Sequence, residues 1–138
     1  MTAIYVASAT SCGSGREGHV ETSDGKVSLD LAFPKELGGS GAGTNPEQLA
    51  ALGYAACFSS ALGVTARRRK VTLPPVEITC HVSLHQADDG YSLAFEIVAD
   101  LPGVAVAEAE SLVAEAHTVC PYSKAFRHGA PTLVRVAA

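Results

Sequence analysis

Residues 45–70, NPEQLAALGYAACFSSALGVTARRRK, have the features of one long helix. Asn45 precedes a proline, which suits it to cap a helix, and Pro46 fits the first helical position. Residues 48–66 carry no charged side chain, and the basic residues 67–70 follow where cations stabilise a helix C-terminus. The segment approaches the roughly 18-residue length of a membrane span. Its serines, threonine and glycines predict instead a helix buried inside the protein.

Shorter elements surround this helix in the sequence. Ser23-Asp24-Gly25 stands between two β-prone runs and predicts a hairpin. Alternation of apolar and polar residues predicts further strands at 3–9, 76–85, 91–99 and 131–136, and helical spacing predicts a second helix over 104–117. A short turn is expected to begin at Cys120-Pro121. Hairpins with separate helices indicate an α+β fold, and 138 residues suit a single domain over 1–138.

The composition limits the possible functions. Hydrophobic residues make up 47% of the chain, which indicates apolar surface that is covered in an oligomer or lines a ligand site. A net charge of −4 argues against a nucleic-acid-binding protein, because such proteins present a basic face. The N-terminal residues lack the positive and apolar regions of a signal peptide. We therefore expect a cytoplasmic protein without a membrane partner.

Four cysteines, at positions 12, 57, 80 and 120, lie far apart and form no CxxC or CxxH motif, which disfavours structural zinc. On the predicted strand, His81 and His85 are separated by about 13 Å and cannot chelate one ion. No metal site is expected. Cys80 alternates with aliphatic residues and is interpreted as a core residue, whereas Cys12 lies in a Gly/Ser stretch and is expected to be exposed. Their roles stay open.

Cys57 lies midway along the uncharged helix, where burial raises the pKa of a thiol and makes it inert. To react, it needs a cation from elsewhere, and Arg16 in Gly15-Arg16-Glu17-Gly18 could supply one. Glu47, at the helix start, has two interpretations: it stabilises the exposed N–H groups, or it clamps an arginine. Cys120, before Pro121, would lie at a helix N-terminus, which favours thiolate. Composition alone favours the interpretation of Cys57 as an inert core cysteine.

Several motifs together resemble the organic hydroperoxide resistance proteins of the OsmC-like family. The similarity is carried by GTNPEQL at 43–49 followed by GYAACF at 53–58. In the expected order come GREG at 15–18, the Asp24-Gly25 hairpin with LGG at 37–39, and CPYSKA at 120–125. The resemblance extends over nearly the whole chain, and Ser14 stands where a glycine is common.

The resemblance implies antiparallel sheets wrapped around a long buried central helix, in an intertwined homodimer with active sites at the interface. It implies that Cys57 attacks an organic hydroperoxide (alkyl or fatty-acid) and that Cys120 resolves the sulfenic acid into a disulfide. Arg16 and Glu47 would be the activating partners of Cys57. No cofactor would be bound, and dihydrolipoamide or lipoylated proteins would act as reductant.

Two questions remain open at this stage. Glu47 and Cys57 are ten residues apart, about 15 Å along a straight helix, so the carboxylate cannot touch the sulfur directly. Either Arg16 spans part of this gap or the carboxylate comes from the partner subunit, which is our preference. Alternative functions are an OsmC-type peroxidase of broader specificity and a non-catalytic carrier of apolar ligands. Apolar walls supplied by Phe58, Leu52 or neighbouring loops would explain a preference for alkyl or fatty-acid hydroperoxides over hydrogen peroxide.

Overall fold

The computed structural model describes residues 2–137. The chain divides into two compact units, one ending at Leu49 and the other beginning at Ala50. The single domain expected over 1–138 stays a prediction.

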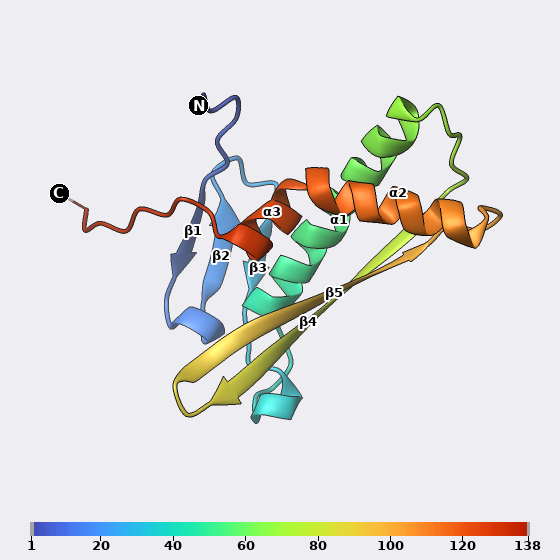
Figure 1. Cartoon of the computed structure of the whole chain (residues 1–138). Coiled ribbons are helices and arrows are strands. Elements are labelled where there is room, and N and C mark those ends of the chain that lie inside the picture. Colours follow the sequence, from blue (N-terminus) through green and yellow to red (C-terminus); the bar gives the residue numbers. More distant parts are fainter. Residues whose placement is uncertain (1, 138) are drawn as a thin grey trace. The chain divides into compact units, whose positions relative to one another are not determined.

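The first unit contains a three-stranded antiparallel sheet (Figure 1). Its strands are β1 (Ala9–Cys12), β2 (His19–Thr22) and β3 (Ser28–Asp30), with two 3-10 turns, η1 (Gly15–Glu17) and η2 (Lys35–Leu37). The hairpin predicted at residues 23–25 is confirmed, because β2 and β3 pair across it. The strand predicted over 3–9 is wrong: β1 begins only at Ala9, and residues 4–6 are exposed outside any strand.

Helix α1 (Pro46–Arg68) begins at the predicted proline and ends within the basic run 67–70, where its C-terminus was expected. The side chain of Asn45 caps it, since the backbone N–H of Gln48 donates to its Oδ1 at 2.9 Å. Length and composition alone would also allow α1 to span a membrane, as they do for many core helices. Its buried side chains are Tyr54, Phe58, Ala61, Leu62, Thr65 and Ala66. They agree with the predicted core helix.

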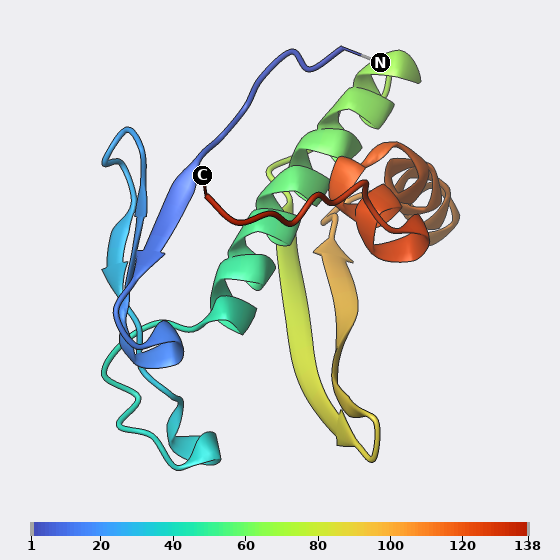
Figure 2. The same ribbon diagram turned by 90° about the vertical axis from the view of Figure 1, so that its left-hand side faces the viewer.

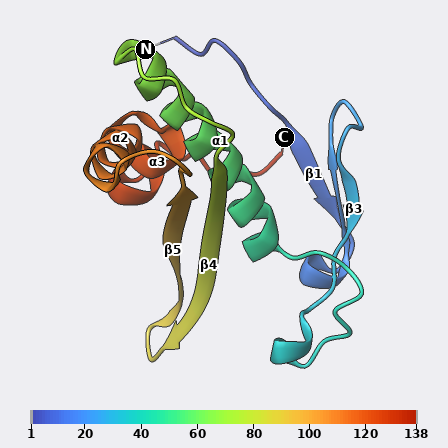
Figure 3. The same cartoon turned by 90° about the vertical axis from the view of Figure 1, so that its right-hand side faces the viewer.

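The second unit combines most of α1 with a hairpin and two helices. Strands β4 (Glu77–Ala87) and β5 (Gly90–Asp100) pair along their whole length, and α2 (Val106–Val119) is followed at once by α3 (Pro121–His128). The predicted hairpin and second helix are thereby confirmed. The hairpin and the two helices lie along the same side of α1 (Figures 2 and 3).

One apolar core forms where these elements meet. Phe58, Leu62, Leu112, Ala116 and Cys120 are almost completely inaccessible. The interior face of the hairpin packs against them with Ile78, Cys80, Phe95, Ile97 and Ala99. β4 is half-buried at every second residue from Ile78 to Leu84, which confirms the interpretation of Cys80 as a residue that faces the core among aliphatic neighbours.

The end of the chain differs from its prediction. Residues 131–136 were expected to form a final strand, but they are extended, unpaired with any described strand, and exposed (Figure 1). Their apolar side chains Leu133, Val134 and Val136 are 85 to 91% accessible. Alternation predicted a strand here because it reports an apolar face, whereas a strand also needs a neighbouring backbone to pair with.

Candidate active site

The second unit brings Cys57 and Cys120 together. Their sulfur atoms lie 3.6 Å apart, although the residues are separated by 63 positions in the sequence. A disulfide bond is about 2.05 Å long, so the two sulfurs need to approach by only about 1.5 Å to bond. Both cysteines are free thiols in this structure. The arrangement is that of a dithiol within reach of disulfide formation.

Local structure explains why Cys120 stands where it does. It is the last residue before α3 and also the residue that ends α2, with its backbone N–H bonded to the carbonyl of Ala116. Pro121 cannot donate a hydrogen bond, so it starts a new helix more easily than it continues the old one. The short helix predicted from Cys120-Pro121 is confirmed. Cys120 is completely buried, and Cys57 is partly buried.

The surroundings of Cys57 within this unit do not activate it. Burial raises the pKa of the Cys57 thiol, and the neighbouring Cys120 adds to that rise. The backbone N–H of Tyr122 acts in the opposite direction, because it donates to the sulfur. Since the thiolate is the reactive form, Cys57 needs a positive charge to work near neutral pH.

The first unit contains an ion pair between two residues that the sequence also singled out. Arg16 Nη1 donates to Glu47 Oε2 at 2.8 Å, and Nη2 donates to Oε1 at 2.6 Å. This hydrogen bonding lowers the pKa of the Glu47 carboxyl and raises the pKa of Arg16. Arg16 also lies over the ring of Phe33, at 5.9 Å from the centroid. The guanidinium is therefore charged and held in one orientation.

The loop that carries Arg16 depends on its glycines. Gly15 has φ of +59°, in the left-handed region that other residues adopt rarely. A side chain on Gly18 would lie 2.2 Å from the carbonyl oxygen of Cys12, so no larger residue fits there. These two constraints shape the turn η1. The backbone N–H of Phe33 also donates a hydrogen bond to the side-chain carboxylate of Glu17.

A hydrogen-bonded chain of polar side chains, which the sequence analysis missed, links residues that lie three positions from one or other of the two cysteines. The hydroxyl of Ser123 lies 2.8 Å from the hydroxyl of Tyr54 and 2.9 Å from Nδ1 of His117. His117 had no evident partner from sequence. A signal existed in the spacing, because Tyr54 precedes Cys57 by three residues, and His117 and Ser123 flank Cys120 by three residues each.

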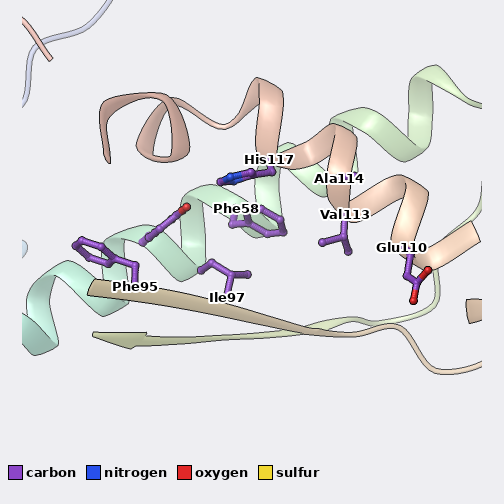
Figure 4. A pocket seen from close by; sticks show the side chains of 8 residues that line it. Phe58, Phe95, Ile97, Glu110, Val113, Ala114 and His117 are labelled. Carbon is purple, nitrogen blue, oxygen red and sulfur yellow. The ribbon is translucent and has the colours of Figure 1, made fainter. Parts of the chain in front are cut away.

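An apolar cavity of about 390 Å³ lies between α1, α2 and β5 (Figure 4). Its walls are formed by Tyr54, Phe58, Phe95, Ile97, Val113 and Ala114, and Glu110 and His117 also line it. Phe58 was expected to be a wall residue. Leu52, the other candidate, is 66% accessible and does not line this cavity.

The remaining cysteines and histidines form no metal cluster among residues 2–137. Cys12 is exposed on β1, and burial raises the pKa of Cys80 on the inner face of β4. His81 and His85 are exposed, as expected for that strand.

His19 bonds to Asp30 through Nδ1 and to Ser28 through Nε2, each at 2.8 Å. The same order of aspartate, histidine and serine occurs in the catalytic triad of serine hydrolases, where the aspartate carboxylate is buried. The side chain of Asp30 is 89% accessible. We interpret the cluster as a polar link between β2 and β3.

The chain was compared with known protein families and curated proteins. The family described as OsmC-like protein matches residues 38–134. The organic hydroperoxide resistance protein of Xanthomonas axonopodis pv. citri (strain 306) is 46% identical over 126 residues, which cover 90% of this chain and 88% of that protein. The organic hydroperoxide resistance protein OhrA of Bacillus subtilis (strain 168) is 46% identical over 129 residues, with 88% of each chain covered.

Solved structures give the same result. An organic hydroperoxide resistance protein OsmC from Legionella pneumophila superposes with a TM-score of 0.87 and 50% identity, covering 93% of both chains. The organic hydroperoxide resistance protein OhrB of Bacillus subtilis superposes with a TM-score of 0.82 and 38% identity, covering 91% of this chain and 93% of that one.

Antiparallel sheets, a long central helix and two neighbouring cysteines, one on that helix and one where two later helices meet, define a class of small α+β dithiol proteins. The comparisons narrow this class further. The chain belongs to the OsmC-like family, among the organic hydroperoxide resistance proteins.

Proposed function

We propose that this protein is a thiol peroxidase that reduces organic hydroperoxides to alcohols during oxidative stress. The observation that carries the proposal is the 3.6 Å separation between the sulfurs of Cys57 and Cys120. A pair of free thiols at this distance, one buried and one partly buried, supports a reaction cycle through a disulfide. The names of the relatives, which refer to organic hydroperoxide resistance, support the choice of substrate.

The first step oxidises Cys57. Its thiolate attacks the outer oxygen of the hydroperoxide, an S–O bond forms, and the O–O bond breaks. The leaving alkoxide takes a proton and becomes the alcohol, while the sulfur becomes a sulfenic acid. Arg16 is proposed to favour the Cys57 thiolate and to stabilise the charge that develops on the leaving oxygen. Its two-point bond to Glu47 supports this role, because it fixes the plane of the guanidinium.

The second step resolves the sulfenic acid. Cys120 attacks the sulfur of Cys57, the S–S bond forms, and the hydroxyl leaves as water with the proton of Cys120. Disulfide formation has to be faster than the reaction of the sulfenic acid with a second hydroperoxide, which would oxidise Cys57 to the sulfinic acid. Dihydrolipoamide or a lipoylated protein is proposed to reduce the disulfide. The names of the relatives support organic hydroperoxides as substrates, and we propose alkyl or fatty-acid hydroperoxides among them.

We also propose an intertwined homodimer in the cytoplasm. The extended segments at both ends of the chain support association, because Ile4, Tyr5, Leu133 and Val134 expose large apolar side chains. A dimer could bring the Arg16–Glu47 pair of one subunit to the thiols of the other. Light scattering would detect the dimer, and Val134→Glu is expected to weaken it.

The decisive experiment is a single-turnover titration of the reduced protein with cumene hydroperoxide, followed by peptide mapping. Loss of two thiols per chain, mapped to Cys57 and Cys120 and reversed by dihydrolipoamide, is the expected result. Comparison with hydrogen peroxide separates this activity from that of a broader OsmC-type peroxidase. If both thiols stay reduced in excess hydroperoxide, the peroxidase is excluded and the carrier of apolar ligands becomes the better explanation.

A further inference from the structure

The polar chain of Tyr54, Ser123 and His117 crosses the interior of the second unit beside the thiol pair. Ser123 is completely buried, and Tyr54 is 4% accessible. Both bonds of Ser123 are shorter than 3 Å. A buried hydroxyl group that loses its hydrogen-bond partner destabilises the fold. The two bonds of Ser123 therefore stabilise the folded protein.

The hydrogen bonds of Tyr54, Ser123 and His117 link the helical segments that carry the two sulfurs. Tyr54 lies three residues before Cys57 on α1, and Ser123 lies three residues after Cys120 on α3. Residues three apart in a helix lie on the same side, one turn from each other. The Tyr54–Ser123 bond therefore joins α1 to α3 one turn away from the point where the sulfurs meet.

His117 completes the link from the other direction. It lies in the last turn of α2, three residues before Cys120, so Ser123 and His117 tie together the two helices that share Cys120. Burial and the charge of Arg127 lower the pKa of His117. The neutral ring can accept from Ser123 or donate to it, and the link holds in both tautomers.

We propose that Ser123 is a positioning residue for the resolving step. Its hydroxyl holds the first turn of α3 against α1, so that Cys120 stays within reach of the Cys57 sulfenic acid. The inference rests on the proposed function. In the step that it affects, the S–S bond forms, the S–O bond of Cys57 breaks, and the hydroxyl leaves as water with the proton of Cys120. The hydroperoxide has already supplied the oxidising equivalent.

Two variants remove the Tyr54–Ser123 hydrogen bond, called the bridge here, each by deleting one of its two partners. Ser123→Ala deletes the central hydroxyl, and Tyr54→Phe deletes the phenol oxygen while it keeps the ring in the core. Each variant is mixed with one equivalent and then with excess cumene hydroperoxide, quenched at intervals, and analysed by mass spectrometry. The readouts are the rate of Cys57 oxidation, the rate of Cys57–Cys120 disulfide formation, and the fraction of sulfinic Cys57.

The first rate is expected to change less than twofold in Ser123→Ala, since Ser123 is completely buried and does not line the apolar cavity. Disulfide formation is expected to slow by roughly tenfold to a hundredfold, because a misplacement of about 1 Å costs on that order. The sulfinic fraction should rise as resolution slows. Tyr54→Phe keeps the test possible if Ser123→Ala does not fold.

Matched controls separate positioning from general stability. Thr118→Ala removes a hydroxyl from the same end of α2 that bonds only to the carbonyl of Glu115, and it should resolve like the unmodified protein. His117→Asn keeps a polar atom near the place of Nδ1 and should resolve faster than His117→Leu. A purely structural role would lower the melting temperature without changing the ratio of disulfide to sulfinic acid.

The outcomes are distinct. If the unmodified protein forms the disulfide and both bridge variants resolve at the same rate, the inference is wrong and the proposed function stands. If the unmodified protein never forms a Cys57–Cys120 disulfide, the proposed function is wrong and the inference falls with it.

Discussion

The guanidinium of Arg16 faces the carboxylate of Glu47 with two parallel hydrogen bonds, of 2.8 and 2.6 Å, across 31 positions of the sequence. Two-point pairing of this kind fixes orientation as well as distance. It joins the η1 turn to the first turn of α1, and neither residue is deeply buried. Substitutions of either residue therefore test the contribution of the ion pair to stability and to the reactivity of Cys57.

The first prediction concerns stability against pH in Glu47→Gln. Arg16 lowers the pKa of Glu47 below its ordinary value of 4.5, so the ionised carboxylate stabilises the folded state. This contribution is present above pH 4.5 and is lost as the pH falls through the lower, folded pKa. At pH 7 the variant is expected to be less stable by about 1 kcal/mol or less, because the side chain of Arg16 is 31% accessible.

Urea unfolding from pH 7 to pH 2.5 measures this difference. The two proteins should converge in the acid range. Asp24, whose pKa is also lowered, is present in both and cancels in the comparison. A difference that is constant over the whole range would contradict the predicted linkage.

The second prediction concerns the pH dependence of peroxide reduction in Arg16→Ala. Burial raises the pKa of Cys57, and the proposed function assigns to Arg16 the opposing effect. Without the guanidinium, the pKa of the thiol should rise and the rate profile should move to higher pH. At pH 7 the rate of Cys57 oxidation should fall about tenfold for each unit of that rise.

Arg16→Lys is the matched comparison, since it keeps the charge but cannot form the two-point bond. An intermediate profile is expected, measured by stopped-flow kinetics of the first oxidation. Identical profiles for all three proteins would exclude electrostatic activation by Arg16.

The third prediction separates the redox pair from the other cysteines. Cys12 is exposed on β1, and Cys80 packs into the core from β4, so neither is needed for the proposed disulfide. The Cys12→Ser/Cys80→Ala double variant should lose both of its remaining thiols on treatment with one equivalent of cumene hydroperoxide. The unmodified protein should lose two of its four. A thiol titration under denaturing conditions measures both, and retention of two thiols in the double variant would refute the assignment.

The fourth prediction compares two glycines of α1. A Cβ atom added to Gly53 would lie 2.6 Å from the hydroxyl oxygen of Tyr122, so Gly53→Ala has to displace that ring. We expect a loss of about 1–3 kcal/mol in the free energy of unfolding. Gly63→Ala is the control, because its nearest neighbour would be Arg67 Nη1 at 3.5 Å. It should gain roughly 0.5–1 kcal/mol from helix propensity. Urea unfolding checks both, and equal shifts would contradict the close approach of α3.

Local signals explain what could be predicted from the sequence. The start of α1 was located correctly because Asn45 and Pro46 determine a helix start through their own backbone preferences. The turn at Asp24-Gly25 and the break at Pro121 depend equally on one or two residues. Each prediction needed no knowledge of distant parts of the chain.

The predictions that failed, or were missed, depended on distant partners. The terminal segments 3–9 and 131–136 alternate like strands, yet pairing requires a second backbone that alternation does not specify. The hydrogen bonds of Ser123 join residues 69 and 6 positions away. The three-residue spacing around each cysteine is visible in the sequence. It does not predict these hydrogen bonds, because they form only when α1 packs against α3.

Cys120 belongs to two helices at once, as the residue that ends α2 and precedes α3. No flexible linker separates its Cα from either axis. The sulfurs have to approach by about 1.5 Å to bond, and we expect any part of that shift made by the backbone at Cys120 to change the angle between α2 and α3. Hydrogen exchange along both helices, compared between the reduced and the oxidised protein, would measure this change without any probe of the sulfur.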